Sequence, residues 1–200
     1  MDADAVEIRV LGCLIEKQRT TPDAYPLSLN SLRLACNQAT SRDPVVDHDE
    51  PTIRAALERL SRKGWVRLAS GPGSRAVKYR HLLDDALGLD DAEVSLLAVL
   101  MLRGPQTTGE LKQRTERLYA FGPAEVEETL ERLIGRELAA RLPRRPGEKG
   151  ERYAQLLGAA ESESGVVPER APHEESPSLQ ERVARLEEEV ARLREALGRR

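Results

Sequence analysis

The chain contains one pattern twice, and this internal repeat is the feature that most restricts the folds available to it. Residues 51–81 and 124–157 each begin with an amphipathic helical pattern that ends near a glycine and leads into two short β-prone segments. The aligned positions include Leu57 with Leu130, Leu60 with Leu133, and Tyr79 with Tyr153. Two further helical stretches precede each segment. Three helices followed by a hairpin are typical of a winged helix, so the sequence predicts two of them.

The helix ends can also be predicted. Residues 4–18 place their apolar side chains on one helical face, which indicates a first helix. Ser28 can cap the second helix, and Pro51 suits the first turn of the third. In the second copy, Thr108 should cap the second helix and Gly122-Pro123 should start the third.

The repeat predicts a mainly helical fold with small β-hairpin wings, built from two tandem winged-helix domains and a C-terminal coiled-coil helix. The predicted boundaries are 1–86 for the first domain, 87–160 for the second, 161–177 for a disordered linker and 178–200 for the coiled coil. The linker is rich in Pro, Glu and Ser and has few apolar residues, a composition that does not support a packed core.

The C-terminal segment carries apolar residues at alternating spacings of four and three, which is a heptad seam. The seam residues, which we expect to mediate dimerisation, are Leu179, Val183, Leu186, Val190, Leu193 and Leu197. Valine at a positions with leucine at d positions favours a parallel two-stranded coil, and the flanking charges attract across such a pair. The sequence therefore predicts a homodimer. The alternative is that this short helix docks on its own chain.

A distinctive run begins at Glu16 and reads Glu-Lys-Gln-Arg-Thr-Thr-Pro-Asp-Ala-Tyr-Pro-Leu-Ser-Leu-Asn. With the residues around it, this run resembles the bacterial YceH-type family, a set of tandem winged-helix proteins of unassigned function. The similarity spans about residues 5–157 and is looser in the second copy. The resemblance implies a fold, and it implies no activity, cofactor or catalytic residue.

Composition and motifs argue against an enzyme. The 31 basic and 34 acidic side chains give a net charge of −3 and are spread evenly, so any DNA contact must come from a local basic patch. The sequence has no nucleotide-binding or hydrolase fingerprint, and we predict no cofactor and no metal. His48 lies among acidic neighbours, but adjacent loop residues rarely converge on one ion, and capping of the next helix is the expected role of those acids.

The two cysteines, Cys13 and Cys36, fit reduced thiols of a cytoplasmic protein. The N-terminus lacks the basic and apolar regions of a signal peptide. The chain also lacks an apolar stretch approaching the roughly 20 residues that would span a bilayer. We therefore expect a cytoplasmic protein with no membrane partner.

The candidate DNA-binding surface is the third helix and the wing of the first copy, because a winged helix places its third helix in the major groove. The predicted contacts are Arg54, Arg59, Arg62, Lys63, Arg67, Arg75, Lys78 and Arg80. Arginine and lysine bind phosphates, and arginine also reads guanine. The alternative is a solvated amphipathic face. The corresponding helix of the second copy is acidic and should be repelled by DNA.

A second group of polar residues surrounds the Thr20–Pro26 segment and the second helix. Its members are Glu16, Lys17, Thr21, Asp23, Tyr25, Asn30, Asn37, Gln38 and Arg42. Polar side chains of this kind often hold an irregular loop by bonding its backbone groups. The alternative is a recognition surface for a partner or small ligand, and the sequence leaves both interpretations open.

Two functional hypotheses follow. The first is a DNA-binding transcriptional regulator or nucleoid-associated protein that contacts double-stranded DNA through its first copy. The second is a non-enzymatic assembly module whose tandem winged helices bind a protein partner, as in chromosome-condensing complexes. Salt dependence separates them, because DNA affinity falls steeply as the salt concentration rises.

Overall fold

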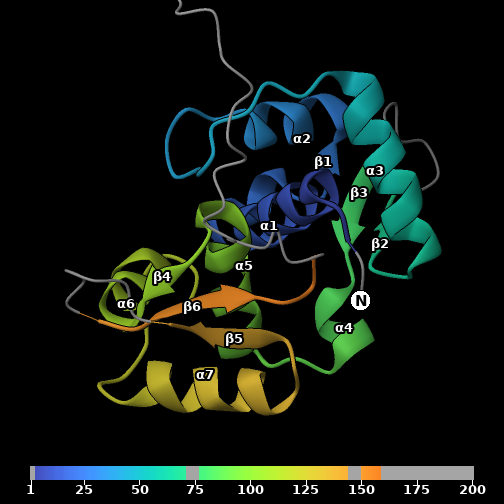
Figure 1. The fold of residues 1–200 in the computed structure, drawn as a ribbon. Coiled ribbons are helices and arrows are strands. Elements are labelled where there is room, and N and C mark those ends of the chain that lie inside the picture. The colour runs from blue at the N-terminus through green and yellow to red at the C-terminus, as the bar shows by residue number, and fades with distance from the viewer. Residues whose placement is uncertain (1–2, 71–76, 144–149, 159–200) are drawn as a thin grey trace, which may run out of the picture. The chain divides into compact units, whose positions relative to one another are not determined.

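The computed structural model describes residues 3–70, 77–143 and 150–158. The first copy contains α1 (Ala5–Thr20), a 3-10 helix (Pro22–Ala24), β1 (Leu27–Ser28), α2 (Leu29–Cys36), α3 (Glu50–Arg62), β2 (Val66–Leu68), β3 (Lys78–His81) and α4 (Leu83–Leu87) (Figure 1). The second contains α5 (Asp91–Arg103), β4 (Gln106–Thr107), α6 (Thr108–Thr115), α7 (Glu125–Gly135), β5 (Ala139–Leu142) and β6 (Arg152–Gln155). The described chain is therefore mainly helical, as predicted.

The internal repeat is present in three dimensions. Each copy runs helix, strand, helix, helix, strand, strand, and the two antiparallel sheets have the equivalent strand orders β1-β3-β2 and β4-β6-β5. Tyr79 and Tyr153, which align in the sequence, occupy equivalent places, since Tyr79 faces Leu27 and Tyr153 faces Gln106. Each sheet has three strands where the sequence predicted two. The added strands β1 and β4 are two residues long, too short to show a strand periodicity.

Several helix ends follow the sequence predictions. Ser28 caps α2 by accepting a hydrogen bond from the Ser31 amide, and Pro51 lies in the first turn of α3. Asp49 caps α3 through the Thr52 amide, which is the capping role expected of the acids around His48.

Two predicted starts in the second copy were wrong. The cap of α6 is Thr107, one residue before the predicted Thr108, because Thr107 and Glu110 form a reciprocal capping box. The third helix was expected from Gly122-Pro123, but α7 begins at Glu125. The Glu125 carboxylate accepts hydrogen bonds from the Gly122 amide and the Tyr119 hydroxyl, which holds the preceding turn outside the helix.

The core is centred on α1 and α5, which pack against each other (Figure 1). Every residue from 7 to 15 and from 92 to 102 is buried, so each helix is covered around most of its circumference. The apolar spacing of residues 4–18 predicts one inward face for α1, and this prediction is too narrow because α5 covers another face. The helices approach closely at Gly12, where an added Cβ would lie 2.9 Å from Cγ of Leu102 and 3.1 Å from Cβ of Met101.

Residues 3–158 group into one compact unit. The amide of Ala3 donates to the carbonyl of Leu157 at 3.1 Å, and Arg19 of α1 pairs with Asp91 of α5, so contacts join the two copies. The predicted boundary between residues 86 and 87 falls within α4, and the division into two domains stays a prediction. The predicted linker and the dimerisation seam lie outside the described residues. In the described part of the chain, no helix is long and apolar enough to cross a membrane.

Candidate functional site

The predicted DNA-binding residues divide into two groups. Arg62 near the end of α3 and Arg67 in β2 are exposed, and neither forms an ion pair or hydrogen bond with a described residue. Arg54 pairs with Glu50 at 2.6 Å, but both side chains are more than half exposed, so water screens the pair. These three arginines are accessible to an anionic partner.

Arg59 and Lys63 are instead engaged with the start of α1. The Arg59 guanidinium lies 2.5 Å from the Asp4 carboxylate and 3.7 Å from that of Glu7, and Lys63 Nζ lies 2.9 Å from Glu7. Asp4 and Glu7 also form the capping box of α1. The Glu7 side chain is 2% exposed, and a buried carboxylate requires paired cations. These two basic residues therefore have a structural role within the chain.

The second copy repeats this arrangement. Arg132 of α7 lies 2.9 Å from Asp90 and 3.5 Å from Glu93, and Arg136 lies 3.1 Å from Glu93. Asp90 and Glu93 form the capping box of α5, as Asp4 and Glu7 do for α1. Because the repeated pairs occur on both copies, they belong to the fold. The signal was present in the sequence, where Asp-x-x-Glu precedes an apolar helical run at both places.

The sheet of the first copy gathers three cations on one face. Arg67 of β2 and Arg80 of β3 are direct cross-strand partners, and Lys78 lies two residues from Arg80 on the same side. None of the three pairs with an acidic residue in the described ranges. Like charges directly opposite each other destabilise a strand pair. Arg75, in the predicted wing, lies outside the described residues.

The polar group around α2 is organised by Arg42, whose side chain is fully buried. Its guanidinium donates to both carboxylate oxygens of Glu16, at 3.1 and 2.6 Å, and to Gln38 at 2.9 Å. It also donates to the carbonyls of Ala35 and Ser41. Burial acts to raise the pKa of Glu16, but the hydrogen bonds and charge of Arg42 outweigh burial and lower that pKa.

Two more members of this group hold backbone segments. Asn37 donates to the carbonyl of His48 at 2.8 Å and accepts from the His48 amide at 2.9 Å, which closes the loop between α2 and α3. The Tyr25 hydroxyl accepts from the His81 amide at 2.9 Å, which fastens the segment after α1 to β3. The hydrogen bonds of Asn37 and Tyr25 to backbone groups are the kind expected if these polar side chains hold irregular segments in place.

The remaining members are at or near the surface. Lys17 bonds Gln38 at 3.4 Å, Thr21 bonds the carbonyl of Lys17, and Asn30 accepts from Arg33. Asp23 is exposed. A recognition role for this group stays a prediction.

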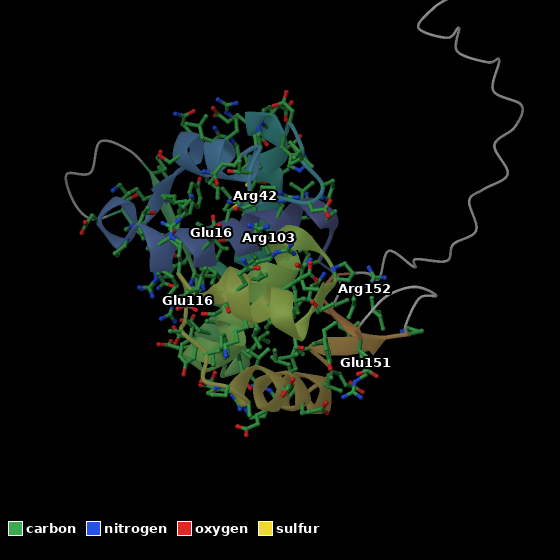
Figure 2. All side chains as sticks on the ribbon, turned by 90° about the vertical axis from the view of Figure 1, so that its left-hand side faces the viewer. Glu16, Arg42, Arg103, Glu116, Glu151 and Arg152 are labelled. Carbon is green, nitrogen blue, oxygen red and sulfur yellow. The ribbon has the colours of Figure 1, made fainter. Side chains whose placement is uncertain are left out.

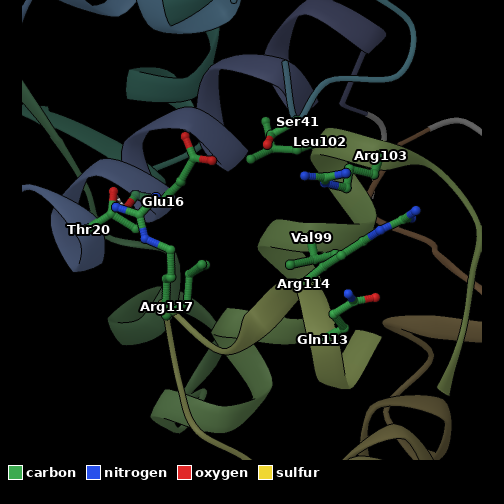
Figure 3. Close-up of a pocket in the computed structure, with 10 residues that line it drawn as sticks. Glu16, Thr20, Ser41, Val99, Leu102, Arg103, Gln113, Arg114 and Arg117 are labelled. Atoms are coloured by element: carbon green, nitrogen blue, oxygen red, sulfur yellow. Dashed lines mark hydrogen bonds between the residues drawn. The ribbon is translucent and has the colours of Figure 1, made fainter. Parts of the chain in front are cut away.

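A cavity of about 440 Å³ lies between α1, α5 and α6 (Figure 3). Its lining is Glu16, Thr20, Ser41, Val99, Leu102, Arg103, Gln113, Arg114, Arg117 and Leu118. Glu16, Arg42 and Arg103 lie near one another where α1 meets α5 (Figure 2). This site could not be predicted from the sequence, because its three arginines lie on α5, on α6 and after α6, with no motif joining them. Among the described residues, no cluster of His, Cys, Asp and Glu has the arrangement of a metal site.

Comparison with known proteins gives a family match. A family described as "Protein of unknown function, DUF480" matches residues 3–148. A UPF0502 protein of Azotobacter vinelandii is 50% identical over 169 residues, covering 84% of this chain and 75% of the relative. One from Pectobacterium atrosepticum is 45% identical over 191 residues, covering 92% and 90%. These matches confirm the resemblance to a bacterial family of unassigned function.

Proposed function

The chain belongs to the DUF480 family of proteins of unknown function, so its role must be argued from its own surface, and we propose that it is a DNA-binding protein. Each copy is, in this proposal, a winged helix. The order helix, strand, helix, helix, strand, strand, with the last two strands forming a hairpin, supports that assignment. The first copy binds double-stranded DNA, and the protein acts as a transcriptional regulator or nucleoid-associated factor.

The observation that carries the proposal is the unpaired cationic face of the first sheet. Arg67 and Arg80 face each other across β2 and β3, with Lys78 beside them. Like charges directly opposite each other destabilise the strand pair unless an anion neutralises them. DNA phosphates supply that anion, and affinity for DNA arises mainly from such neutralisation.

On α3, the accessible cations are Arg54 and Arg62. The sequence had predicted that Arg59 and Lys63 would contact DNA as well. Arg59 and Lys63 are held by Asp4 and Glu7 and contribute less to a DNA surface. The proposed contacts are therefore Arg54, Arg62, Arg67, Lys78 and Arg80.

Among the residues that the structure describes, the second copy has no equivalent pair of opposed cations. The positions equivalent to Arg67 and Arg80 are Ala140 and Ala154, which are direct partners across β5 and β6. Arg141 of β5 lies 2.5 Å from Glu131 and 3.4 Å from Glu151, so its charge is already compensated. Glu127 and Glu128 of α7 are exposed. This copy does not bind DNA in the proposal, since carboxylates directed at phosphates are repulsive.

The test is fluorescence anisotropy of a labelled random duplex with the full chain at ~50 and ~200 mM salt, a range over which phosphate-driven binding falls by orders of magnitude. Arg67→Glu should weaken binding at low salt by about tenfold or more, because a contact becomes a repulsion. Lys112→Glu is the control: Lys112 is exposed on α6 of the second copy and changes charge by the same amount. Equal losses in both variants would contradict the proposed surface.

A second candidate function is a non-enzymatic assembly module. Leu68 and Val77, at the ends of the first hairpin, are 60% and 52% exposed, which suits contact with a protein partner. The absence of DNA binding at both salt concentrations would favour this function.

A further inference from the structure

We propose that the cavity between α1, α5 and α6 binds a small phosphorylated anion. The site is separate from the proposed DNA surface, because no residue of α3, β2 or β3 lines it. A ligand there would contact the first copy through α1 and the second through α5 and α6. The inference does not depend on DNA binding.

The cavity has the size and shape of a small-molecule site. Its volume of about 440 Å³ lies within the range of roughly 300–1,000 Å³ that is usual for such sites. Arg103 enters from the end of α5, Arg114 from α6, and Arg117 from the segment after α6 (Figure 3). The hydroxyl of Ser41 and the amide of Gln113 add neutral hydrogen-bonding groups. The Thr20 hydroxyl already donates to the carbonyl of Glu16.

The charges of the cavity are unbalanced in favour of an anion. Glu16 is the acidic residue of the lining, and its carboxylate is already bound at both oxygens by Arg42. Arg114 is paired with Glu110 at 3.2 Å. Arg103 and Arg117 form no ion pair with a described residue, so two guanidinium groups remain to be neutralised.

The excess of positive charge in the cavity destabilises the charged form of Arg103. Burial, together with the charges of Arg114 and Arg42, lowers the pKa of Arg103. A cation that is half-buried beside other cations is stabilised when an anion enters. Guanidinium groups bind phosphate oxygens through paired hydrogen bonds, and two of them match the double charge of a phosphate monoester.

The apolar part of the lining indicates an organic ligand. Val99, Leu102 and Leu118 contribute hydrocarbon surface beside the arginines. This combination fits a phosphate ester, whose charged end meets the arginines and whose carbon part packs on the apolar wall.

The experiment measures thermal unfolding of the full chain with glycerol 3-phosphate, inorganic phosphate, or glycerol plus sodium chloride at equal ionic strength. A ligand that binds the folded state raises Tm by mass action. We expect Tm to rise by several °C with glycerol 3-phosphate, because about 1 kcal/mol shifts Tm by roughly 2–4 °C in a chain of this size. A smaller rise with inorganic phosphate would show that the carbon part adds affinity. Equal rises would assign binding to the phosphate group.

The R103Q/R117Q double variant should lose the rise in Tm. Lys112→Gln is the control, since Lys112 is exposed, does not line the cavity and lies outside the proposed DNA surface, and it should retain the full rise. Should the double variant fail to fold, Arg117→Gln alone serves, because Arg117 is exposed. The proposal is overturned if neither phosphate compound raises Tm, or if the cavity variants respond as the wild type does.

Discussion

Arg42 and Glu16 form an ion pair with a closest distance of 2.6 Å, in which the arginine side chain is fully buried and the glutamate side chain is 15% exposed. The pair joins the loop after α2 to the C-terminal half of α1. It also leaves the adjacent cavity positively charged, because the Glu16 carboxylate is neutralised by Arg42, which does not line the cavity. The same contact thus serves the fold of the first copy and the electrostatics of the proposed ligand site.

Replacing Glu16 by Gln should destabilise the protein by about 3 kcal/mol, because Arg42 would keep its charge in a buried place without a compensating carboxylate. Urea unfolding followed by circular dichroism measures the loss. Glu50→Gln is the matched control, since Glu50 pairs with Arg54 on the surface, and it should cost less than about 1 kcal/mol. Equal costs for the two variants would show that the buried pair contributes no more than an exposed one.

Gly12→Ala should lower the free energy of unfolding by about 1–3 kcal/mol, although alanine is the better helix former. The added methyl group would lie 2.9 Å from Cγ of Leu102 and would push α1 away from α5. Gly109→Ala in α6 should instead stabilise by up to about 1 kcal/mol, because nothing lies within 4 Å of its added Cβ. Chemical denaturation compares the two directly, and a stabilising Gly12→Ala would refute the close packing.

Stability should fall as the pH is lowered from about 7 to 5. Burial lowers the pKa of His81 from 6.5 to about 4, while Asp84, 3.5 Å away, opposes the shift without reversing it. The unfolded chain binds the proton first, so protonation favours unfolding across this window. The loss at pH 5 should be about 2 kcal/mol. His81→Gln should flatten the profile of Tm against pH between 5 and 7, and an unchanged slope would assign the effect to other groups.

Cys13 and Cys36 should not react with Ellman's reagent in the folded protein and should both react in denaturant. Both residues are completely buried, and contact with Cys13 together with burial raises the pKa of the Cys36 thiol. The reactive species is the thiolate, so burial and a raised pKa both slow the reaction. Rapid labelling of either cysteine under native conditions would show that this part of the first copy opens readily.

Glu7→Gln should strengthen DNA binding at low salt by a few fold, because it removes the carboxylate charge that compensates Lys63 and part of the charge that compensates Arg59, which stays paired with Asp4. Glu93→Gln makes the equivalent change in the second copy and should leave DNA affinity unchanged. Anisotropy titrations at a temperature where both variants are folded provide the comparison. An equal gain in both variants would mean that net charge, and not the α3 surface, controls binding.

The sequence predicted those parts of the fold that local rules determine. The repeat, the Ser28 and Asp49 caps, Pro51 in the first turn of α3 and the two hairpins follow from spacing and capping chemistry over a few residues. The third strands were missed because two residues carry no periodicity.

The all-round burial of α1 and α5 and the arginine cavity were missed for a different reason. Both depend on contacts between residues far apart in the chain, such as Gly12 with Leu102, which one sequence does not reveal. The ion pairs of Arg59 and Lys63 could be predicted only in part. Asp4-x-x-Glu7 is a recognisable capping pattern, but the sequence does not show that these two acids also pair with Arg59 and Lys63.

The packing of α1 on α5 has a consequence for synthesis of the protein. When the first ninety or so residues have left the ribosome, α1 has α2, α3 and β3 to pack on but lacks α5, which comes later in the chain. The flank around Gly12 then faces water until Met101 and Leu102 emerge. We therefore expect the nascent first copy to be prone to aggregation until α5 has emerged and covers this flank.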